Sequence, residues 1–313
     1  MTQIKIRNIP WMKHRFLLFA LSMALVAVSL AVIFAKGLNF GTDFTGGLKL
    51  IVKFSDQVTE GSVGDALGAA GLSNYVVQRF GEAKNNTFIL KSDLPKDREE
   101  KFSDPYMAAL IKSFGEGKVQ LLQEEFVGPK VGKELRTKGI YAVLWAWVIM
   151  LAYISFRFDF YYAPGALLSL IHDVVVAVGC FALFGLEINL TVVAAILTII
   201  GYSINDTIIV MDRIRENLQR HKGMGLIETV DLSINETLSR TIITSLTVLF
   251  VVVVLFFWTE GDIKNFAFAM TIGVITGTYS SISIASPVFI FLKQHGHRFG
   301  LGKAKPVESK AKA

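Results

Sequence analysis

Charged residues are scarce in this chain. Asp, Glu, Lys and Arg together make up 19% of its 313 residues, whereas hydrophobic residues make up 52%. A soluble domain carries about a quarter charged residues, and here the apolar excess falls in blocks that suit membrane spans. The composition therefore excludes an ordinary soluble domain and indicates a membrane protein.

Motifs for catalysis, disulfide bonding and nucleic-acid binding are also missing. The sequence contains no His-Glu-x-x-His, Gly-x-Ser-x-Gly or Walker motif, so we predict no enzyme activity, no metal and no cofactor. Any energy must come from an ion gradient or a partner. The single cysteine, Cys180, cannot form an intrachain disulfide and is expected to be a small packing residue. The short basic stretches lack an aromatic stacking platform, which argues against nucleic acid as a partner.

Six apolar segments are present, and a helix needs about 20 such residues to cross the hydrocarbon. We expect an α-helical polytopic membrane protein with six transmembrane helices and one α+β domain. The first segment is too long for the apolar part of a typical signal peptide, so we interpret it as a retained helix. The last is expected to tilt or kink near Pro287. The predicted spans are residues 16–35, 139–156, 161–186, 188–211, 240–259 and 266–292.

Basic residues set the expected orientation. Residues 1–15, 212–239 and 293–313 are rich in Lys and Arg, whereas the short loops on the other side carry few. The positive-inside rule places these basic segments in the cytoplasm. Both termini are then cytoplasmic, and the region 36–138 is periplasmic. The net charge of +6 fits topology and attraction to lipid headgroups.

The region 36–138 shows the pattern of a small domain. The strands are expected at 48–54, 75–80, 87–91 and 119–126, and the helices at 59–70 and 95–114. The order β-α-β-β-α-β is that of a ferredoxin-like split unit. This region has no catalytic motif, so binding or mechanical coupling suits it better than chemistry.

An amphipathic stretch precedes the fifth span. Leu226, Val230, Ile234 and Leu238 recur every four residues, with acidic residues between them. This pattern predicts a helix that either lies at the cytoplasmic interface or packs on its own bundle.

Asp206 stands within an otherwise uncharged span. A carboxylate there costs about 2.5–3.5 kcal/mol on insertion scales, so intramembrane acids usually mark ion pathways. A structural ion pair is the alternative. For Asp212 and Arg213, nearer the end of the span, interface anchoring is equally plausible. Helical spacing places Thr198, Tyr202 and Arg213 on the face of Asp206, and Asn205 and Asp212 on a neighbouring face.

Other polar residues are candidates for the same pathway. Arg240 begins the fifth span and is expected either to pair with Asp206 or to anchor the helix at the interface. Thr244 and neighbouring hydroxyls then form a polar seam or a packing surface. Asp173 lies mid-membrane in the third span, next to His172. Adjacent helical residues point about 100° apart, so these two need not act together.

A glycine-rich segment follows the first span. It contains Asp43, Gly46 and Gly47, and the glycines permit tight turns and close backbone approach. It lacks the Lys-Ser/Thr of a phosphate loop, so a structural turn between helix and strand explains it.

Four stretches together resemble the SecF family, which belongs with SecD in the resistance-nodulation-division superfamily. The stretches are residues 41–47, 127–135, 200–217 and Ser239-Arg240-Thr241 with the Thr-rich helix after it. The stretch 200–217 is the most specific, because its neutral Gly-Tyr-Ser-Ile-Asn-Asp core distinguishes SecF from SecD-like relatives.

The resemblance implies a subunit of the Sec protein-export machinery in the bacterial inner membrane. It implies SecD as an obligate partner, the SecYEG channel beside it, YajC and YidC as further partners, and unfolded preprotein as the substrate. It also implies a proton or sodium gradient as the energy source, with Asp206 and Arg240 on the ion path. Six helices form half of a pseudo-symmetric twelve-helix transporter.

Two other functions compete with this interpretation. A homo-oligomeric small-molecule exporter of the same superfamily predicts a larger external region with internal duplication. A static assembly scaffold predicts that Asp206 and Arg240 can be replaced without loss of activity.

Overall fold

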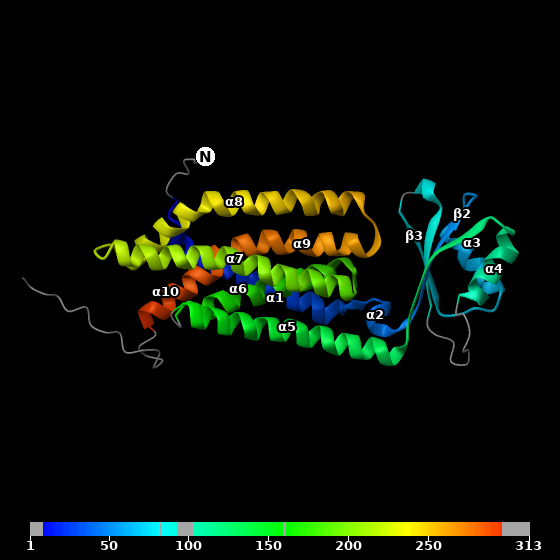
Figure 1. Ribbon diagram of the computed structural model, residues 1–313, viewed down its shortest axis with the longest axis horizontal. Helices are drawn as coiled ribbons and strands as arrows, with labels where there is room; N and C mark the ends of the chain where they lie inside the picture. The colour runs from blue at the N-terminus through cyan, green and yellow to red at the C-terminus, as the bar shows by residue number, and fades with distance from the viewer. Residues whose placement is uncertain (1–8, 82, 93–102, 159–160, 296–313) are drawn as a thin grey trace, which may run out of the picture.

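The protein consists of a long helical bundle with a small α/β domain at one end (Figure 1). The structure is a computed structural model that describes residues 9–81, 83–92, 103–158 and 161–295. The beginning of the predicted helix 95–114 and most of the basic tail 293–313 lie outside these residues, as does much of the segment 1–15.

Six stretches of helix in the described residues are long and apolar enough to cross a membrane, which confirms the predicted fold class. The last is continuous in the chain but changes helix type. The stretches are η1 (Trp11–His14) with α1 (Arg15–Lys36), α5 (Pro129–Arg157), α6 (Ala163–Phe184), α7 (Leu190–Arg220), α8 (Leu226–Trp258), and α9 (Gly261–Ser280) with η3 (Ser281–Ala285) and α10 (Ser286–His295).

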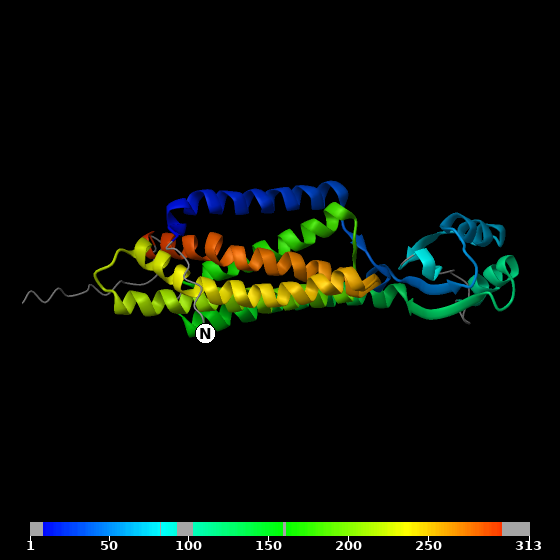
Figure 2. The same cartoon turned by 90° about the horizontal axis from the view of Figure 1, so that it is seen from above.

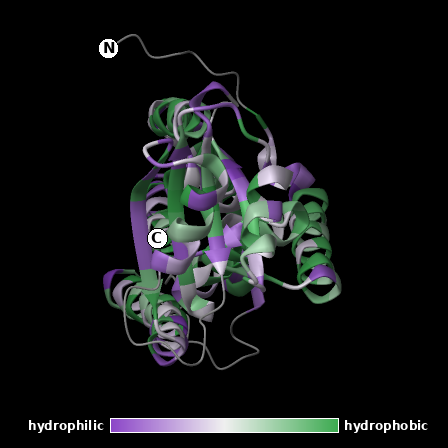
Figure 3. Ribbon diagram, turned by 90° about the vertical axis from the view of Figure 1, so that its right-hand side faces the viewer, coloured by the Kyte–Doolittle hydropathy of each residue, from purple (hydrophilic) through white to green (hydrophobic). Residues whose placement is uncertain are grey.

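Helices α6, α7 and α9 form the centre of the bundle. Within the apolar stretch of each span, 56% of the residues are buried in α6, 50% in α7 and 72% in the α9–α10 span. The corresponding shares are 11% in α1, 6% in α5 and 17% in α8. Figure 2 shows α1 along one outer side, and the end-on view of Figure 3 shows peripheral helices coloured mostly as hydrophobic. Exposed Phe16, Trp145 and Phe250 belong to these outer helices, whose surfaces suit lipid or a partner helix.

Several helices extend beyond their predicted spans. Helix α5 begins at Pro129 and not at residue 139, and α7 continues to Arg220. The amphipathic stretch is the first part of α8 and not a separate surface helix, because Val230 and Ile234 pack in the core of the bundle. Of the two predicted alternatives, packing on the bundle is the one observed.

The last span contains an irregular turn. The π-helix η3 separates α9 from α10, and the hydroxyl of Ser286 donates a hydrogen bond to the carbonyl of Ser281 at 3.0 Å. Pro287 follows directly, and a proline cannot donate the backbone bond that a regular α-helix needs. Short π-helical turns of this kind occur frequently at functional sites.

The domain contains one four-stranded antiparallel sheet in the order β3-β4-β2-β5. Its element order matches the predicted one, and the ferredoxin-like assignment stays a prediction. Thr59 caps α3 through a reciprocal capping box with Ser62. The elements are β2 (Gly47–Phe54), α3 (Glu60–Ala69), β3 (Tyr75–Phe80), η2 (Ala83–Asn85), β4 (Thr87–Ser92), α4 (Asp104–Phe114) and β5 (Val119–Val127).

Ion pairs join the domain to the bundle. Lys49 on β2 lies 3.1 Å from Asp262 at the start of α9 and also 3.1 Å from Glu125 on β5. Lys91 on β4 pairs with Glu187, which precedes α7. Glu187 belongs to the two-residue strand β6 (Glu187–Ile188), which pairs in parallel with β1 (Asn39–Phe40). The domain is thus tied to the start of α9 and to the connection between α6 and α7.

Candidate functional site

Asp206 lies inside the bundle, on the side of α7 that faces α8 and α9. The residue is 1% exposed, and its Oδ2 lies 3.5 Å from the hydroxyl of Ser245 on α8. Ser245 in turn shares a 2.7 Å hydrogen bond with Thr278 on α9. Among the described residues, Asp206 Oδ1 has no hydrogen-bond partner. A buried carboxylate with so few donors is costly to keep charged, as expected for a site that takes up a cation or a proton.

Arg240 does not form an ion pair with Asp206. The side chain of Arg240 lies on the exposed side of α8, whereas Thr241 and Ser245 face inward. Within the described part of the chain no basic nitrogen comes within 4.0 Å of the Asp206 carboxylate, although the charge of Arg240 still acts on it at longer range. The hydroxyl of Thr244 donates to the carbonyl of Arg240 at 3.0 Å and does not reach the carboxylate.

The helical face predicted for α7 is only partly assembled. Tyr202 is half-buried, with its hydroxyl inside the protein near Ser245 and Asp206. Thr198 is exposed, and its hydroxyl donates to the carbonyl of its own helix at Ala194, 2.8 Å away. Asn205 is exposed as well. The structure therefore places Tyr202 at the site and turns Thr198 and Asn205 toward the outside of the bundle.

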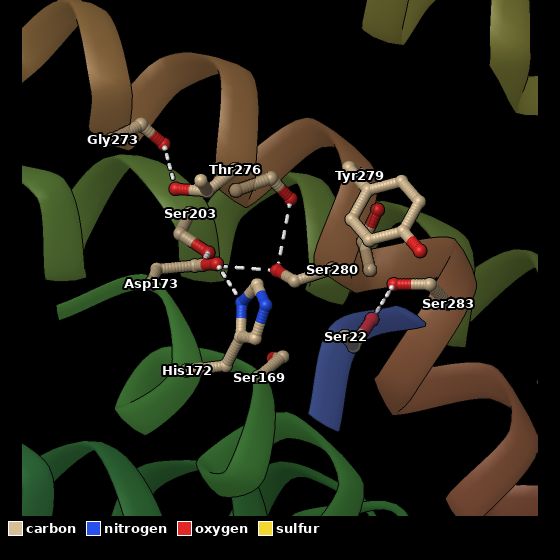
Figure 4. Close-up of polar contacts among 12 residues, drawn as sticks. Ser22, Ser169, His172, Asp173, Ser203, Gly273, Thr276, Tyr279, Ser280 and Ser283 are labelled. Carbon is tan, nitrogen blue, oxygen red and sulfur yellow. Dashed lines mark hydrogen bonds and ion pairs between the residues drawn. The ribbon is translucent and has the colours of Figure 1, made fainter. Parts of the chain in front are cut away.

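A second polar centre surrounds Asp173 on α6 (Figure 4). Asp173 is 0% exposed and His172 is 1% exposed. The Oδ1 atom of Asp173 lies 2.9 Å from Nδ1 of His172, so the two neighbours do interact. Its Oδ2 accepts hydrogen bonds from Ser203 on α7 at 2.6 Å and from Ser280 on α9 at 2.9 Å. This carboxylate thus ties the three central helices together.

Asp212 and Arg213 form ion pairs toward the C-terminal end of α7. Asp212 lies 4.0 Å from Arg157 on α5, and Arg213 lies 2.7 Å from Glu236 on α8 and 2.5 Å from Glu216. These residues are partly or largely exposed, and their contacts join α7 to its neighbours. They fit anchoring of helix ends better than a role beside Asp206.

The glycine-rich segment is a structural joint. It contains the short helix α2 (Thr42–Thr45), and Oδ2 of Asp43 accepts a hydrogen bond from the backbone of Leu190, 2.9 Å away, at the start of α7. Gly46 and Gly47 have φ values of 76° and 143°, where only glycine is comfortable. A Cβ on Gly46 would stand 2.8 Å from Pro129, and one on Gly47 would stand 2.9 Å from the carbonyl oxygen of Ser92.

Sequence reasoning did not single out Ser203 and Ser280, the two hydroxyl partners of Asp173. Ser203 comes one helical turn before Asp206, and Ser280 belongs to the hydroxyl-rich last span. A hydroxyl one turn from an intramembrane acid was a usable signal. The glycine pair of α9, Gly273 and Gly277, also packs closely on α7. In the described residues, no group of three or more His, Cys, Asp or Glu side chains is placed to hold a metal.

Known proteins resemble this chain over nearly its whole length. The family described as protein export membrane protein SecD/SecF, C-terminal, matches residues 106–295, and the SecD/SecF GG motif matches residues 31–58. A protein translocase subunit SecF from Desulfurispirillum indicum is 40% identical over 297 residues, which cover 92% of this chain and 93% of that protein. Its counterpart from Pseudomonas aeruginosa is 38% identical over 289 residues, covering 92% of this chain and 93% of the relative.

A solved structure extends the likeness to the fold. The crystal structure of SecDF, a translocon-associated membrane protein from Thermus thermophilus, superposes with a TM-score of 0.81 at 35% sequence identity. The match covers 94% of this chain but only 40% of the SecDF chain.

Proposed function

The chain belongs to the SecD/SecF family as a multi-pass SecF subunit of the Sec protein translocase, and from this we propose that it couples an ion gradient to preprotein export. The coupling ion is H⁺ or Na⁺, and the gradient acts through Asp206. The termini face the cytoplasm, and the α/β domain lies outside the inner membrane, as the basic residues indicate.

Asp206 carries this proposal. Its carboxylate is buried between α7, α8 and α9, and one of its oxygens has no hydrogen-bond partner within the described residues. Binding of a proton or a sodium ion removes the uncompensated charge and changes what Ser245 can contact. Moving one charge across 100 mV supplies about 2.3 kcal/mol, which biases a two-state equilibrium roughly tens-fold. That is enough to drive a rearrangement of the three helices.

We further propose that a SecD-type chain covers the outer face of α7. Thr198, Gly201 and Asn205 line up on this face at helical spacing, and all three are exposed. Small and polar residues are typical of contacts between membrane helices, whereas a bare amide in lipid is costly. Exposed Arg240 lies on the neighbouring helix α8. The partial coverage of SecDF, 40%, is consistent with a missing half.

The remaining partners follow from the same role. The complex would act beside the SecYEG channel with YajC and YidC, and the outer domain would engage unfolded preprotein. The domain is tied to α9 through Lys49 and Asp262, so a shift of α9 would move it.

The test is Asp206→Asn, expressed in cells that lack the native gene. We expect the gradient-dependent part of the export of a slow-folding preprotein to be lost, and Asp206→Glu to restore some of it. Asp212→Asn is the matched control, because Asp212 lies on the same helix but 60% of its side chain is exposed. Normal export with Asp206→Asn would refute the proposal and favour a static scaffold. Export rates measured with proton and sodium gradients varied separately identify the ion.

A further inference from the structure

The contacts of the His172–Asp173 pair favour one protonation state. A carboxylate is an acceptor only, and three groups point at Asp173: Nδ1 of His172 and the hydroxyls of Ser203 and Ser280. The simplest assignment is therefore an ionised Asp173, with the proton of His172 on Nδ1. In the neutral imidazole, Nε2 then carries a lone pair.

That lone pair is buried and unused. His172 Nε2 has no hydrogen-bond partner among the residues that the structure describes, and the side chain is 1% exposed. Figure 4 shows the imidazole ring between Asp173 and the Ser22–Ser283 pair, whose hydroxyls lie 3.1 Å apart. A buried basic nitrogen without a partner is a strong acceptor for a proton or for a water that carries one.

The charges around the pair favour proton uptake. A neutral His172 leaves the carboxylate of Asp173 as a net negative charge inside the membrane. Asp206, the first acid on the neighbouring helix α7, is also negative when ionised. Lys, Arg and His residues in the described parts of α1, α5, α9 and α10 occur toward the ends of those spans, and on α7 they occur only from Arg213 onward. Figure 4 shows one phenol in the same region, that of Tyr279 on α9, whose hydroxyl donates to the carbonyl of Leu18 at 2.9 Å.

We propose that His172 and Asp173 form a second proton-binding site of the bundle, in which Nε2 of His172 takes up one proton. The donor is a hydronium ion or a protonated water chain from the aqueous phase. An N–H bond forms at Nε2, and the net charge of the pair changes from −1 to zero as an imidazolium–carboxylate pair. The proton leaves by the reverse step, to water.

This site deepens the proposed function, because one helix, α7, carries both Asp206 and a residue that binds Asp173. Ser203 binds Asp173 and comes one turn before Asp206 on α7. Ser280, the other donor to Oδ2, is the last residue of α9 before the π-helix η3. A change of charge on the pair therefore alters hydrogen bonds at the irregular turn and on the helix that carries Asp206.

The test is a nuclear magnetic resonance titration of ¹⁵N-histidine in the full-length chain, in lipid nanodiscs with any partner that co-purifies. The chain has five histidines, and His172→Gln identifies the signals of His172. Over about pH 5–9, we expect Nε2 to gain a proton while Nδ1 stays protonated throughout. Asp173→Asn should abolish this uptake within the range, because it removes the charge that the imidazolium neutralises.

Two further variants keep the result decisive. Ser203→Ala removes one donor but leaves both titrating groups, so uptake at Nε2 should persist. Asp206→Asn should also leave uptake at His172 in place, which separates this proposal from the role of Asp206 in export. The proposal is overturned if Nε2 of the unmodified chain stays unprotonated down to about pH 5. It is equally overturned if Asp173→Asn leaves the titration unchanged.

Discussion

Replacing Lys49 by Met should loosen the junction between the α/β domain and α9. The side chain of Lys49 is 11% exposed and lies 3.1 Å from Asp262, whose side chain is 38% exposed. A well-shielded hydrogen bond to a charged group contributes about 1.5–3 kcal/mol, and an exposed ion pair about 0–1 kcal/mol. The partial exposure of Asp262 places this contact between those limits, at about 1–2 kcal/mol.

Hydrogen–deuterium exchange measures this effect directly. A loss of about 1–2 kcal/mol raises local opening roughly 5- to 30-fold, so amide exchange at residues 259–264 should accelerate by that factor in Lys49→Met. Lys118→Met is the matched control within the same domain. Its pair with Asp56 spans 2.7 Å, but the two side chains are 53% and 63% exposed, so little change is expected.

A double-mutant cycle isolates the contact that crosses between the two parts. Lys49→Met should have little further effect once Asp262→Asn is present, whereas in a Glu125→Gln background it should still accelerate exchange at residues 259–264. Glu125 belongs to the domain itself, so its pair with Lys49 does not cross the junction. Unchanged exchange in Lys49→Met, or an equal change in Lys118→Met, would refute the idea that Lys49 ties the domain down.

The pH dependence of this contact follows from the pKa of Lys49. Burial lowers that pKa, but the attraction of Asp262 and then of Glu125 outweighs it, and the net pKa is raised. A raised lysine pKa means that the contact stabilises the folded state. This stabilisation is present in full below the unfolded pKa of about 10.4 and is lost as the pH rises through the folded pKa. The difference in exchange between Lys49→Met and the unmodified chain should therefore persist from neutral pH to about pH 10 and shrink above it.

Two other substitutions test packing and capping. Gly273→Ala forces a Cβ into the side chain of Ile199 and should lower the free energy of unfolding by about 1–3 kcal/mol. Gly139→Ala is the control, because its Cβ meets Val193 at an ordinary 3.6 Å and should not lower the free energy of unfolding. Thermal unfolding compares the two variants. Asp43→Ala removes the acceptor for the backbone N–H of Leu190 and should weaken the first turn of α7 by about 0.5–2 kcal/mol. Amide exchange in that turn should become faster. Unchanged exchange would mean that Asn189 caps α7 alone.

The transmembrane fold was predictable because the bilayer imposes a minimum length on every apolar helix. The helix ends were less so. Helix α5 begins at Pro129 and α7 ends at Arg220, well outside the apolar blocks, because a helix continues into water wherever its residues allow it. The amphipathic part of α8 had two plausible surroundings, and the burial of Val230 depends on tertiary packing that one sequence does not specify.

The candidate site was predictable residue by residue but not as an assembly. Asp206 and Asp173 stand out because an acid is costly in an apolar helix. Their partners depend on the register between helices, which Gly277 sets by letting α9 approach Ser203 on α7. The contact between His172 and Asp173 depends on side-chain rotamers, and the position of Arg240 depends on the rotation of α8. Neither quantity is encoded in local spacing.

The passage from β5 to α5 has a mechanical consequence. A single residue, Gly128, separates the last strand of the domain from a helix of 29 residues, so the two form an almost unbroken arm about 44 Å long on the helical side. The other covalent link passes through Gly46 and Gly47, which hold backbone conformations that only glycine adopts comfortably and pack against Pro129 and Ser92. The start of α5 therefore lies between the strand that precedes it and the glycine-rich segment, so any displacement of α5 would be transmitted directly to the sheet.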